Sequence, residues 1–155
     1  MSPDLRAELR QRKPFRSLQQ EAQLNIYRTD AMLVDAFEQL LKPYGISLTQ
    51  YNVLRILQGA EPEGLCRNEL RDRMLTRMPD VTRLLDRLEL AGLVTRTREA
   101  EDRRLVETHI TAEGRRLLGR LDGAVADEHQ RRLGHLTAAQ LRTLIRLLTL
   151  VRRSA

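Results

Sequence analysis

Residues 81–94 read Val81-Thr-Arg-Leu-Leu-Asp-Arg-Leu-Glu-Leu-Ala-Gly-Leu-Val94, and this stretch decides the fold. Its apolar residues recur three and four positions apart, which predicts a helix with a buried face formed by Val81, Leu84, Leu85 and Leu88. The opposite face is polar and is formed by Asp80, Thr82, Arg83, Asp86 and Arg87. Pro79 suits the first turn of such a helix, and Gly92 suits the left-handed residue that closes it.

A β-hairpin is predicted directly after this helix. Residues 94–98 and residues 105–110 both alternate between polar and apolar side chains, which is typical of strands. The six residues between them are polar or charged apart from one alanine, and they include Arg103 and Arg104. The hairpin is therefore expected to end in an exposed, charged tip.

Two helices are predicted upstream, and each has a recognisable boundary. The first covers residues 17–42 and stops at Pro43, which cannot continue a helix. The second covers residues 48–59, after Ser47 and Gln50, which have the spacing of a capping box. Polar residues 1–16 precede both helices and are expected to form a basic tail.

A short third helix is predicted between the loop of residues 60–64 and the break at residues 76–78. Its N-cap falls at Cys66, with Glu69 three residues later, as in a variant capping box. Cys66 has two readings, a small structural residue or a thiol sensor. The second is open because a helix N-terminus lowers the pKa of a thiol.

Two long helices are predicted after the hairpin, capped by Thr111 and by Thr137 with Gln140. One side of the last helix is apolar and consists of Leu141, Leu144, Ile145, Leu148 and Val151. The core formed by residues 48–110 offers only a limited surface on which the apolar sides of the outer helices could pack. We therefore expect a homodimer, with packing of these helices on their own core as the alternative.

This order of elements predicts a mainly α (α+β) fold, a winged helix-turn-helix with a small β-hairpin wing. In that architecture one helix enters the major groove of DNA and the hairpin reaches phosphates or the minor groove. Arg83 and Arg87 would project side by side from the helix, while Arg103 and Arg104 would lie at the hairpin tip. Each arginine pair alone is typical of a solvated surface, but the complete order favours double-stranded DNA binding.

The sequence resembles the multiple-antibiotic-resistance regulator (MarR) family over residues 18–153. Besides residues 81–94, the segments that carry the resemblance are Leu48-Thr-Gln-Tyr-Asn-Val-Leu-Arg-Ile-Leu57, Asn68-Glu-Leu70, Glu101-Asp-Arg-Arg104 and Ile110-Thr-Ala-Glu-Gly114. The resemblance implies a transcriptional repressor that binds a pseudo-palindromic operator as a homodimer. A small molecule, such as a phenolic or other aromatic acid, would release it.

The resemblance also implies site residues and a division of the chain. By position, Thr82, Arg83 and Arg87 match recognition-helix contacts and Arg104 matches a wing contact. The full set expected to bind DNA is Arg77, Pro79, Asp80, Thr82, Arg83, Arg87, Arg98, Arg103 and Arg104. The expected parts are a basic tail (1–16), an N-terminal dimerisation helix (17–46), a DNA-binding domain (47–110) and C-terminal dimerisation helices (111–155).

Three residues are candidates for binding the effector. Tyr27 and Tyr51 could hydrogen-bond a phenol or a carboxylate, and Arg28 could pair with an anion. Each also has a simpler reading, because a tyrosine often packs with its hydroxyl satisfied. Arg28 could equally be solvated or paired with Asp30 or Asp35.

Composition excludes several other classes of protein. No apolar run among the 155 residues approaches the roughly 20 that a membrane helix needs, and no secretory h-region is evident. The single cysteine excludes an internal disulfide and fits a reducing compartment. These observations fit a cytoplasmic protein, and the resemblance implies a bacterial or archaeal one that is associated with the nucleoid through DNA binding.

Two other functions were weighed against DNA binding. An enzyme is not expected, nor is a cofactor or a metal site, because there is no glycine-rich phosphate loop. His129 and His135 are also six residues apart rather than at a metal-binding i, i+4 spacing. A helical module that binds an acidic partner remains the alternative, because residues 111–155 hold nine cations and four anions of a chain with net charge +6.

Overall fold

A computed structural model describes residues 4–77, 80–98 and 106–153 of the chain. The chain forms two compact units, residues 1–39 and residues 40–155. The predicted hairpin tip and three of the predicted DNA-contacting residues (Pro79, Arg103 and Arg104) lie outside the described residues.

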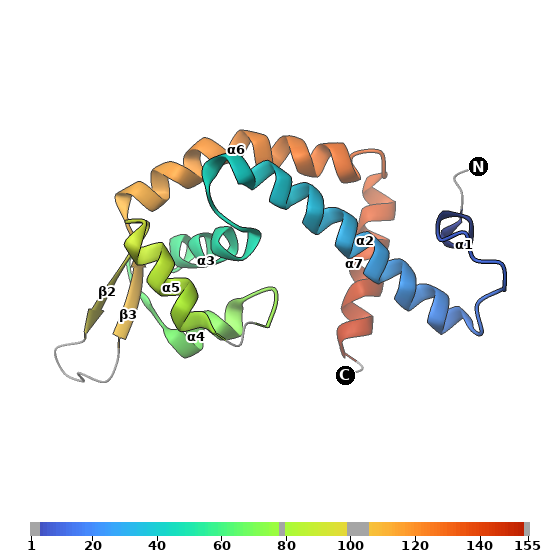
Figure 1. Cartoon of the computed structure of the whole chain (residues 1–155), viewed down its shortest axis with the longest axis horizontal. Helices are drawn as coiled ribbons and strands as arrows, with labels where there is room; N and C mark the ends of the chain where they lie inside the picture. The colour runs from blue at the N-terminus through green and yellow to red at the C-terminus, as the bar shows by residue number, and fades with distance from the viewer. Residues whose placement is uncertain (1–3, 78–79, 99–105, 154–155) are drawn as a thin grey trace. The chain divides into compact units, whose positions relative to one another are not determined.

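The first unit holds a short helix, α1 (Leu5–Glu8), and most of a long one, α2 (Leu18–Leu41) (Figure 1). The Asp4 carboxylate starts α1 by accepting a hydrogen bond from Ala7 N at 2.9 Å. The predicted basic tail thus contains one helical turn. After α2 the chain passes through a 3₁₀ helix, η1 (Lys42–Tyr44), which confirms the predicted stop at Pro43.

The second unit begins with α3 (Leu48–Gly59), which starts at the predicted capping box. Gln50 N donates to the Ser47 hydroxyl at 3.1 Å, and Ser47 N donates to the Gln50 side chain at 2.9 Å. The helix buries Val53, Leu54 and Leu57 completely or nearly so. It provides the centre of the core, contacting α4, α6 and the sheet.

The sheet has three antiparallel strands in the order β1-β3-β2, where only a two-stranded hairpin was predicted. The hairpin of β2 (Val94–Arg98) and β3 (Val106–Ile110), here called the wing, pairs Val94 with Ile110 and Arg98 with Val106. The missed strand, β1 (Leu65–Cys66), pairs Leu65 with Thr108. It was missed because two residues are too few to show a periodicity.

Two helices, α4 (Arg67–Arg73) and α5 (Val81–Leu90), follow β1. The start predicted for α5 at Pro79 is corrected to Val81, because Asp80 is the N-cap. The four predicted core residues of α5 are all buried. Its end is a Schellman motif: Gly92 N donates to Glu89 O at 2.9 Å, Leu93 N donates to Leu88 O at 3.0 Å, and Gly92 has φ +72°.

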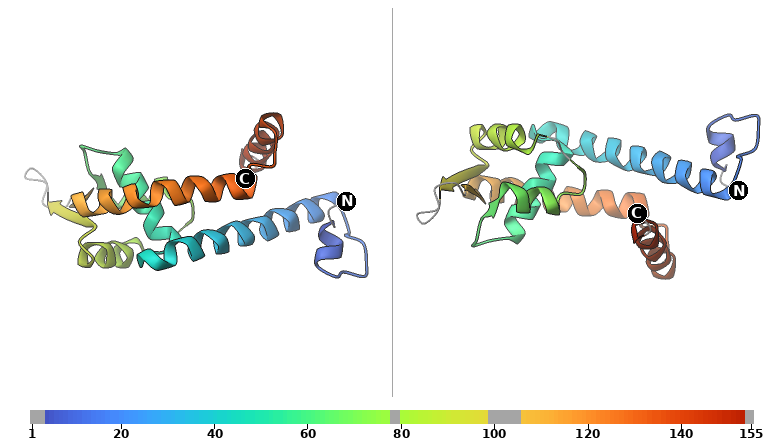
Figure 2. Two further views of the ribbon diagram at one scale, coloured as in Figure 1. Left: turned by 90° about the horizontal axis from the view of Figure 1, so that it is seen from above. Right: turned by 90° about the horizontal axis from the view of Figure 1, so that it is seen from below.

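The last two helices are α6 (Ala112–Leu133) and α7 (Ala138–Arg153). α6 packs along α3, and α7 turns away from its end (Figure 2). The buried side of α6 includes the predicted residues Leu117, Leu118, Leu121 and Val125. In contrast, α7 buries none of its side chains within the chain.

The end of α5, the base of the wing and the start of α6 meet at one point. Thr111 N donates to Leu93 O at 3.1 Å, and the Thr111 hydroxyl donates to Gly92 O at 2.7 Å. The same hydroxyl accepts a hydrogen bond from Gly114 N at 3.1 Å. A Cβ atom on Gly114 would lie only 2.5 Å from Leu93 O, so a larger residue would force the backbone apart.

Gly114→Ala is therefore expected to destabilise the fold by roughly 1–3 kcal/mol, measured by urea unfolding. The matched control is Gly119→Ala on the same helix, where a Cβ atom meets nothing within 4 Å. The control should be neutral or stabilising by up to about 1 kcal/mol, since alanine favours helix. Equal stabilities for the two variants would contradict this account of the junction.

Candidate nucleic-acid interface

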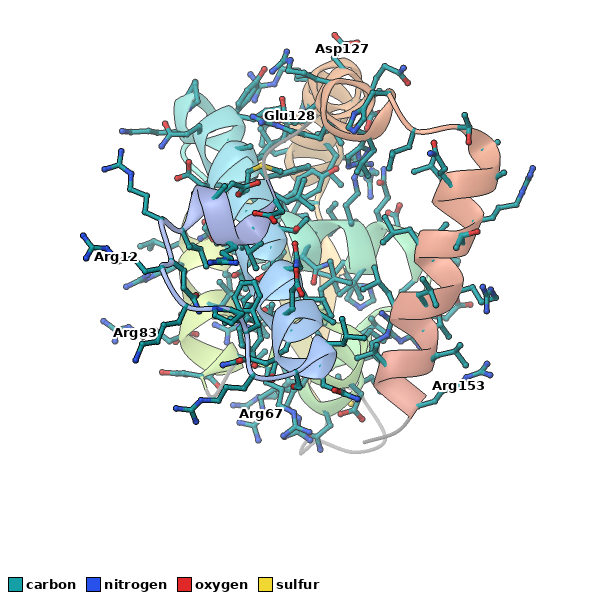
Figure 3. All side chains as sticks on the ribbon, turned by 90° about the vertical axis from the view of Figure 1, so that its right-hand side faces the viewer. Arg12, Arg67, Arg83, Asp127, Glu128 and Arg153 are labelled. Carbon is teal, nitrogen blue, oxygen red and sulfur yellow. The ribbon has the colours of Figure 1, made fainter. Side chains whose placement is uncertain are left out.

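The outer face of α5 presents polar side chains to solvent while its inner face is anchored in the core. Thr82, Arg83 and Arg87 are all exposed, and Arg83 projects outward from the ribbon (Figure 3). The arrangement follows from the sequence pattern, because the leucines and valine of the inner face leave these three residues on the other side. Their polar side chains are thus available to an outside partner.

The other predicted contacts come from segments that flank α5. Arg77 is exposed in the segment before the helix, and Arg98 is exposed at the end of β2. Asp80, by contrast, has a structural partner: its carboxylate accepts a hydrogen bond from Arg83 N at 2.9 Å. That bond makes Asp80 the N-cap of α5, whereas the sequence predicted Asp80 only as a residue of the polar, DNA-contacting face.

Arg96 joins the wing to α5, and sequence reasoning missed it. Its guanidinium, on β2, lies 2.7 Å from the Asp86 carboxylate and donates to Glu89 Oε2 at 2.6 Å. The hydrogen bond to Glu89 raises the pKa of Arg96 above its ordinary value, so the group stays charged. The partners are ten and seven residues away on another element, a spacing with no sequence signature.

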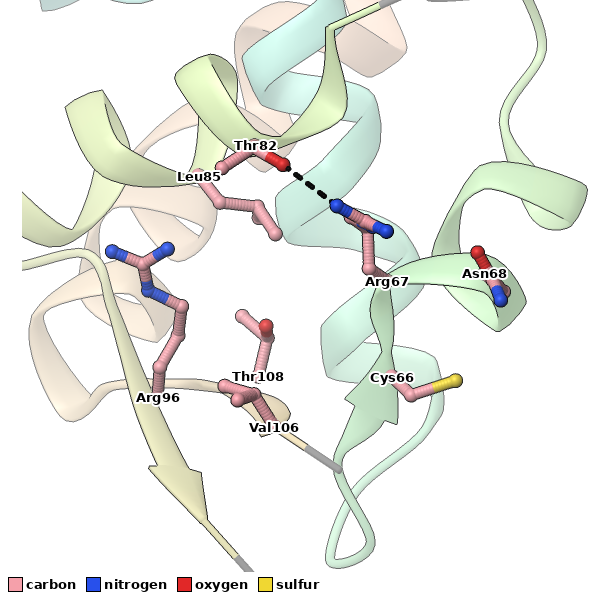
Figure 4. A pocket seen from close by; sticks show the side chains of 8 residues that line it. All are labelled: Cys66, Arg67, Asn68, Thr82, Leu85, Arg96, Val106 and Thr108. Atoms are coloured by element: carbon pink, nitrogen blue, oxygen red, sulfur yellow. Dashed lines mark hydrogen bonds between the residues drawn. The ribbon is translucent and has the colours of Figure 1, made fainter. Parts of the chain in front are cut away.

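A cavity of about 340 Å³ lies between α4, α5 and the sheet. It is lined by Arg67, Asn68, Thr82, Leu85, Arg96, Val106, Thr108 and Cys66 (Figure 4). Arg67, the first residue of α4, reaches across to α5, where its Nη1 donates to the Thr82 hydroxyl at 3.3 Å. Arg67 has no signature in the sequence, because its partner is fifteen residues further along the chain.

The three candidate effector residues each have a partner within their own unit. The Tyr27 hydroxyl is 2.7 Å from Gln23 Nε2, and its side chain is exposed. Arg28 lies 3.9 Å from Glu8, and among the described residues no ion pair joins it to Asp30 or Asp35. Arg28 and Glu8 also line a cavity of about 530 Å³ in the first unit.

Tyr51 is buried on α3, and its hydroxyl accepts a hydrogen bond from Arg55 Nε at 2.9 Å. Arg55 also pairs with Asp122, so this cluster connects α3 to α6. Tyr51 thus packs in the core with its hydroxyl hydrogen-bonded to Arg55.

The predicted dimerisation side chains lie on a helix that is exposed along its length. Leu144 is 38% exposed, Ile145 63% and Val151 55%, and their neighbours Leu147 and Leu150 are also about half exposed. Leu141 and Leu148 are half-buried. An apolar surface of this extent on one helix is unusual for a face that stays in water.

Cys66 occupies the predicted N-cap of α4 and is half-buried. Its backbone N–H donates to Glu69 Oε2 at 2.9 Å, which lowers the pKa of Glu69. Within residues 4–77, 80–98 and 106–153, no three His, Cys, Asp or Glu side chains gather to hold a metal ion. No helix in those ranges is both long and apolar enough to span a membrane.

The sequence model described as the MarR family matches residues 44–105. The HTH-type transcriptional repressor Rv2887 of Mycobacterium tuberculosis is 32% identical over 123 residues, which cover 79% of this chain and 87% of that protein. This chain spans only part of three other curated transcription regulators, and the matches cover 66%, 44% and 57% of their lengths.

Two solved structures extend the comparison. A MarR transcription factor from Planctomyces limnophilus is 44% identical, with a TM-score of 0.68, and the match covers 88% of this chain and 99% of that chain. CouR from Rhodococcus jostii RHA1, solved bound to p-coumaroyl-CoA, is 26% identical, with a TM-score of 0.74 and coverage of 88% and 95%.

The hydrogen bond at the start of α5 leads to a test of Asp80. Asp80→Ala should lower the free energy of unfolding by about 1 kcal/mol, because it leaves Arg83 N without its cap. Asp80→Asn should retain most of the stability, since asparagine caps as well as aspartate. Thermal or urea unfolding measures both, and equal losses would show that the charge matters rather than the cap.

Proposed function

This chain belongs to the MarR family of DNA-binding transcription regulators, and we propose that it is a homodimeric repressor of a pseudo-palindromic operator, released by a small aromatic acid. Membership of a family of transcription regulators confirms that the chain is not an enzyme. The observation that carries the proposal is the outer face of α5, with Thr82, Arg83 and Arg87 exposed above a fully anchored inner face.

The proposed recognition helix is α5. An α-helix fits the major groove, and an arginine there donates two hydrogen bonds to the O6 and N7 atoms of guanine. Arg83 and Arg87 are proposed to read bases in this way. Arg77 and Arg98 are proposed to bind phosphates beside the groove, and Arg103 and Arg104 to enter the minor groove, where narrow A-tracts attract arginine.

The proposed dimer is held by the apolar side of α7. Two copies related by a two-fold axis would cover the exposed leucine, isoleucine and valine side chains on both chains. The same axis would place two copies of α5 on successive half-sites of a pseudo-palindrome. The dimer thus links the apolar surface to operator symmetry.

An aromatic acid is the proposed effector, supported by p-coumaroyl-CoA, the coenzyme A thioester of a phenolic acid, which is bound in the structure of a relative. In the first unit, Arg28 offers a cation beside a cavity, and its 3.9 Å distance to Glu8 describes a weak ion pair that an anionic ligand can replace. Tyr27 is proposed as a hydrogen-bonding group for a phenol or a carboxylate, whereas the buried Tyr51 hydroxyl already accepts a hydrogen bond from Arg55. The relative Rv2887 is a transcriptional repressor, which supports the repressor assignment.

The direct test is fluorescence anisotropy with the purified chain on the DNA upstream of its own gene and on a scrambled duplex of equal length. We expect selective binding that falls roughly 10³–10⁵-fold between 50 and 200 mM salt. Phenolic and other aromatic acids should then release the DNA. Binding to neither duplex at low salt would favour the acidic-partner module instead.

Arg83→Ala and Arg87→Ala should each weaken operator binding by about 1–3 kcal/mol and relax the preference for guanine at one base pair. The matched control is Arg120→Ala on α6, which removes the same charge from another exposed position. A uniform loss on all sequences would identify a phosphate contact, and no loss would remove α5 from the interface.

Ile145→Glu should convert a dimer of twice 18.0 kDa into a monomer of 18.0 kDa at micromolar concentration. A charge buried in an apolar interface should raise the dissociation constant at least about 100-fold. The control is Arg146→Glu, on the polar side of the same helix. Light scattering after gel filtration measures both masses, and a dimeric Ile145→Glu variant would contradict the proposed interface.

A further inference from the structure

Arg67 and Thr82 form a hydrogen-bonded pair between the first residue of α4 and the first turn of α5. Arg67 Nη1 donates to Thr82 Oγ1 at 3.3 Å, and both side chains are exposed. The guanidinium points directly at the threonine, while the neighbouring Cys66 and Asn68 side chains point away (Figure 4). A cation from α4 is thus held beside a side chain of the proposed recognition helix.

We propose that Arg67 is a further DNA-contacting residue, which binds a phosphate and orients the Thr82 hydroxyl so that it donates to a base. The inference rests on the proposed function, because it requires α5 to lie in the major groove. It adds a residue from a different helix and assigns a hydrogen-bonding direction to Thr82.

The charge of Arg67 is available to a phosphate. Arg96, the other arginine at the same cavity, is neutralised by Asp86 and Glu89. Arg67 has no carboxylate partner in the part of the chain that the structure describes. A guanidinium has five N–H donors, so the bond to Thr82 leaves four, and two of these can bind a phosphate in the bidentate manner that arginine favours.

The bond to Arg67 also restricts what Thr82 can recognise. A threonine hydroxyl has one proton to donate and accepts through its lone pairs. The bond from Arg67 occupies one of the two lone pairs of Oγ1 and so directs the hydroxyl proton toward an outside acceptor. In the major groove the acceptors are purine N7, guanine O6 and thymine O4, whereas cytosine presents an amino donor. Thr82 should therefore favour an acceptor and disfavour cytosine at its base position.

Four variants separate the two parts of the proposal. Arg67→Gln removes the charge but keeps an N–H donor for Thr82, and Arg67→Lys keeps the charge. Arg67→Met removes both the charge and the donor. Thr82→Val removes the hydroxyl with little change of shape. The control Arg120→Gln removes one positive charge from the exposed surface of α6.

Binding is measured on sites selected from a random-sequence duplex pool by the wild-type chain. Arg67→Gln should weaken binding about tenfold and reduce the slope of log affinity against log salt by about 0.9, with unchanged base preference. Arg67→Lys should keep the slope. The Arg67→Met variant should also bind sites that carry cytosine at one base pair. The double variant of Arg67→Met and Thr82→Val should lose no more base preference at that base pair than Thr82→Val alone.

Circular dichroism and light scattering should show an unchanged fold and mass for the Arg67 variants, because the side chain is exposed. If the wild type selects a site but Arg67→Gln binds like the wild type or like Arg120→Gln, Arg67 does not contact DNA. If Arg67→Met keeps the wild-type base preference, the orientation of Thr82 is wrong. If the wild type selects no sequence at all, the proposed function fails and this inference fails with it.

Discussion

The contact between Thr111 and the turn after α5 is the constraint on which the rest of the second unit depends. Through its backbone N–H and its hydroxyl, Thr111 holds the carbonyl groups of Leu93 and Gly92. Gly114 lets the first turn of α6 approach the same carbonyls closely. Because α5, the wing and α6 all begin or end here, their relative directions are set together. A change in the path of α6 must therefore alter the position of α5.

The arginines of this chain divide into two groups by their partners. The first group pairs with carboxylates and connects structural elements or helical turns. Its pairs are Arg55 with Asp122, Arg96 with Asp86 and Glu89, Arg115 with Glu61, and Arg132 with Glu128. Arg67, Arg83 and Arg87 have no carboxylate partner among the described residues. Net charge alone does not distinguish the groups. The ion pairs do distinguish them, because the arginines without a carboxylate partner leave uncompensated positive charge on and beside α5.

Periodicity was enough to predict the long helices and the wing, because their buried faces repeat over many residues. It missed β1, whose two residues join a sheet only through a partner more than forty positions away. It also missed Arg67 and Arg96, whose bonds cross between elements. Asp80 was predicted on the polar face, yet its carboxylate faces the backbone. The local sequence pattern identifies the buried and polar faces of a helix or strand, whereas side-chain bonds between elements depend on the tertiary structure.

The separation of the two faces of α5 has a consequence for how new specificities arise in this fold. The inner face and the caps supply the stability of the helix, so Thr82, Arg83 and Arg87 can be exchanged at little cost to folding. Asp86 is different, because it faces outward and yet anchors Arg96 of the wing. Under the proposed function, gene duplicates that diverge toward other operators can vary Thr82, Arg83 and Arg87, whereas Asp86 is expected to change together with its strand partner Arg96.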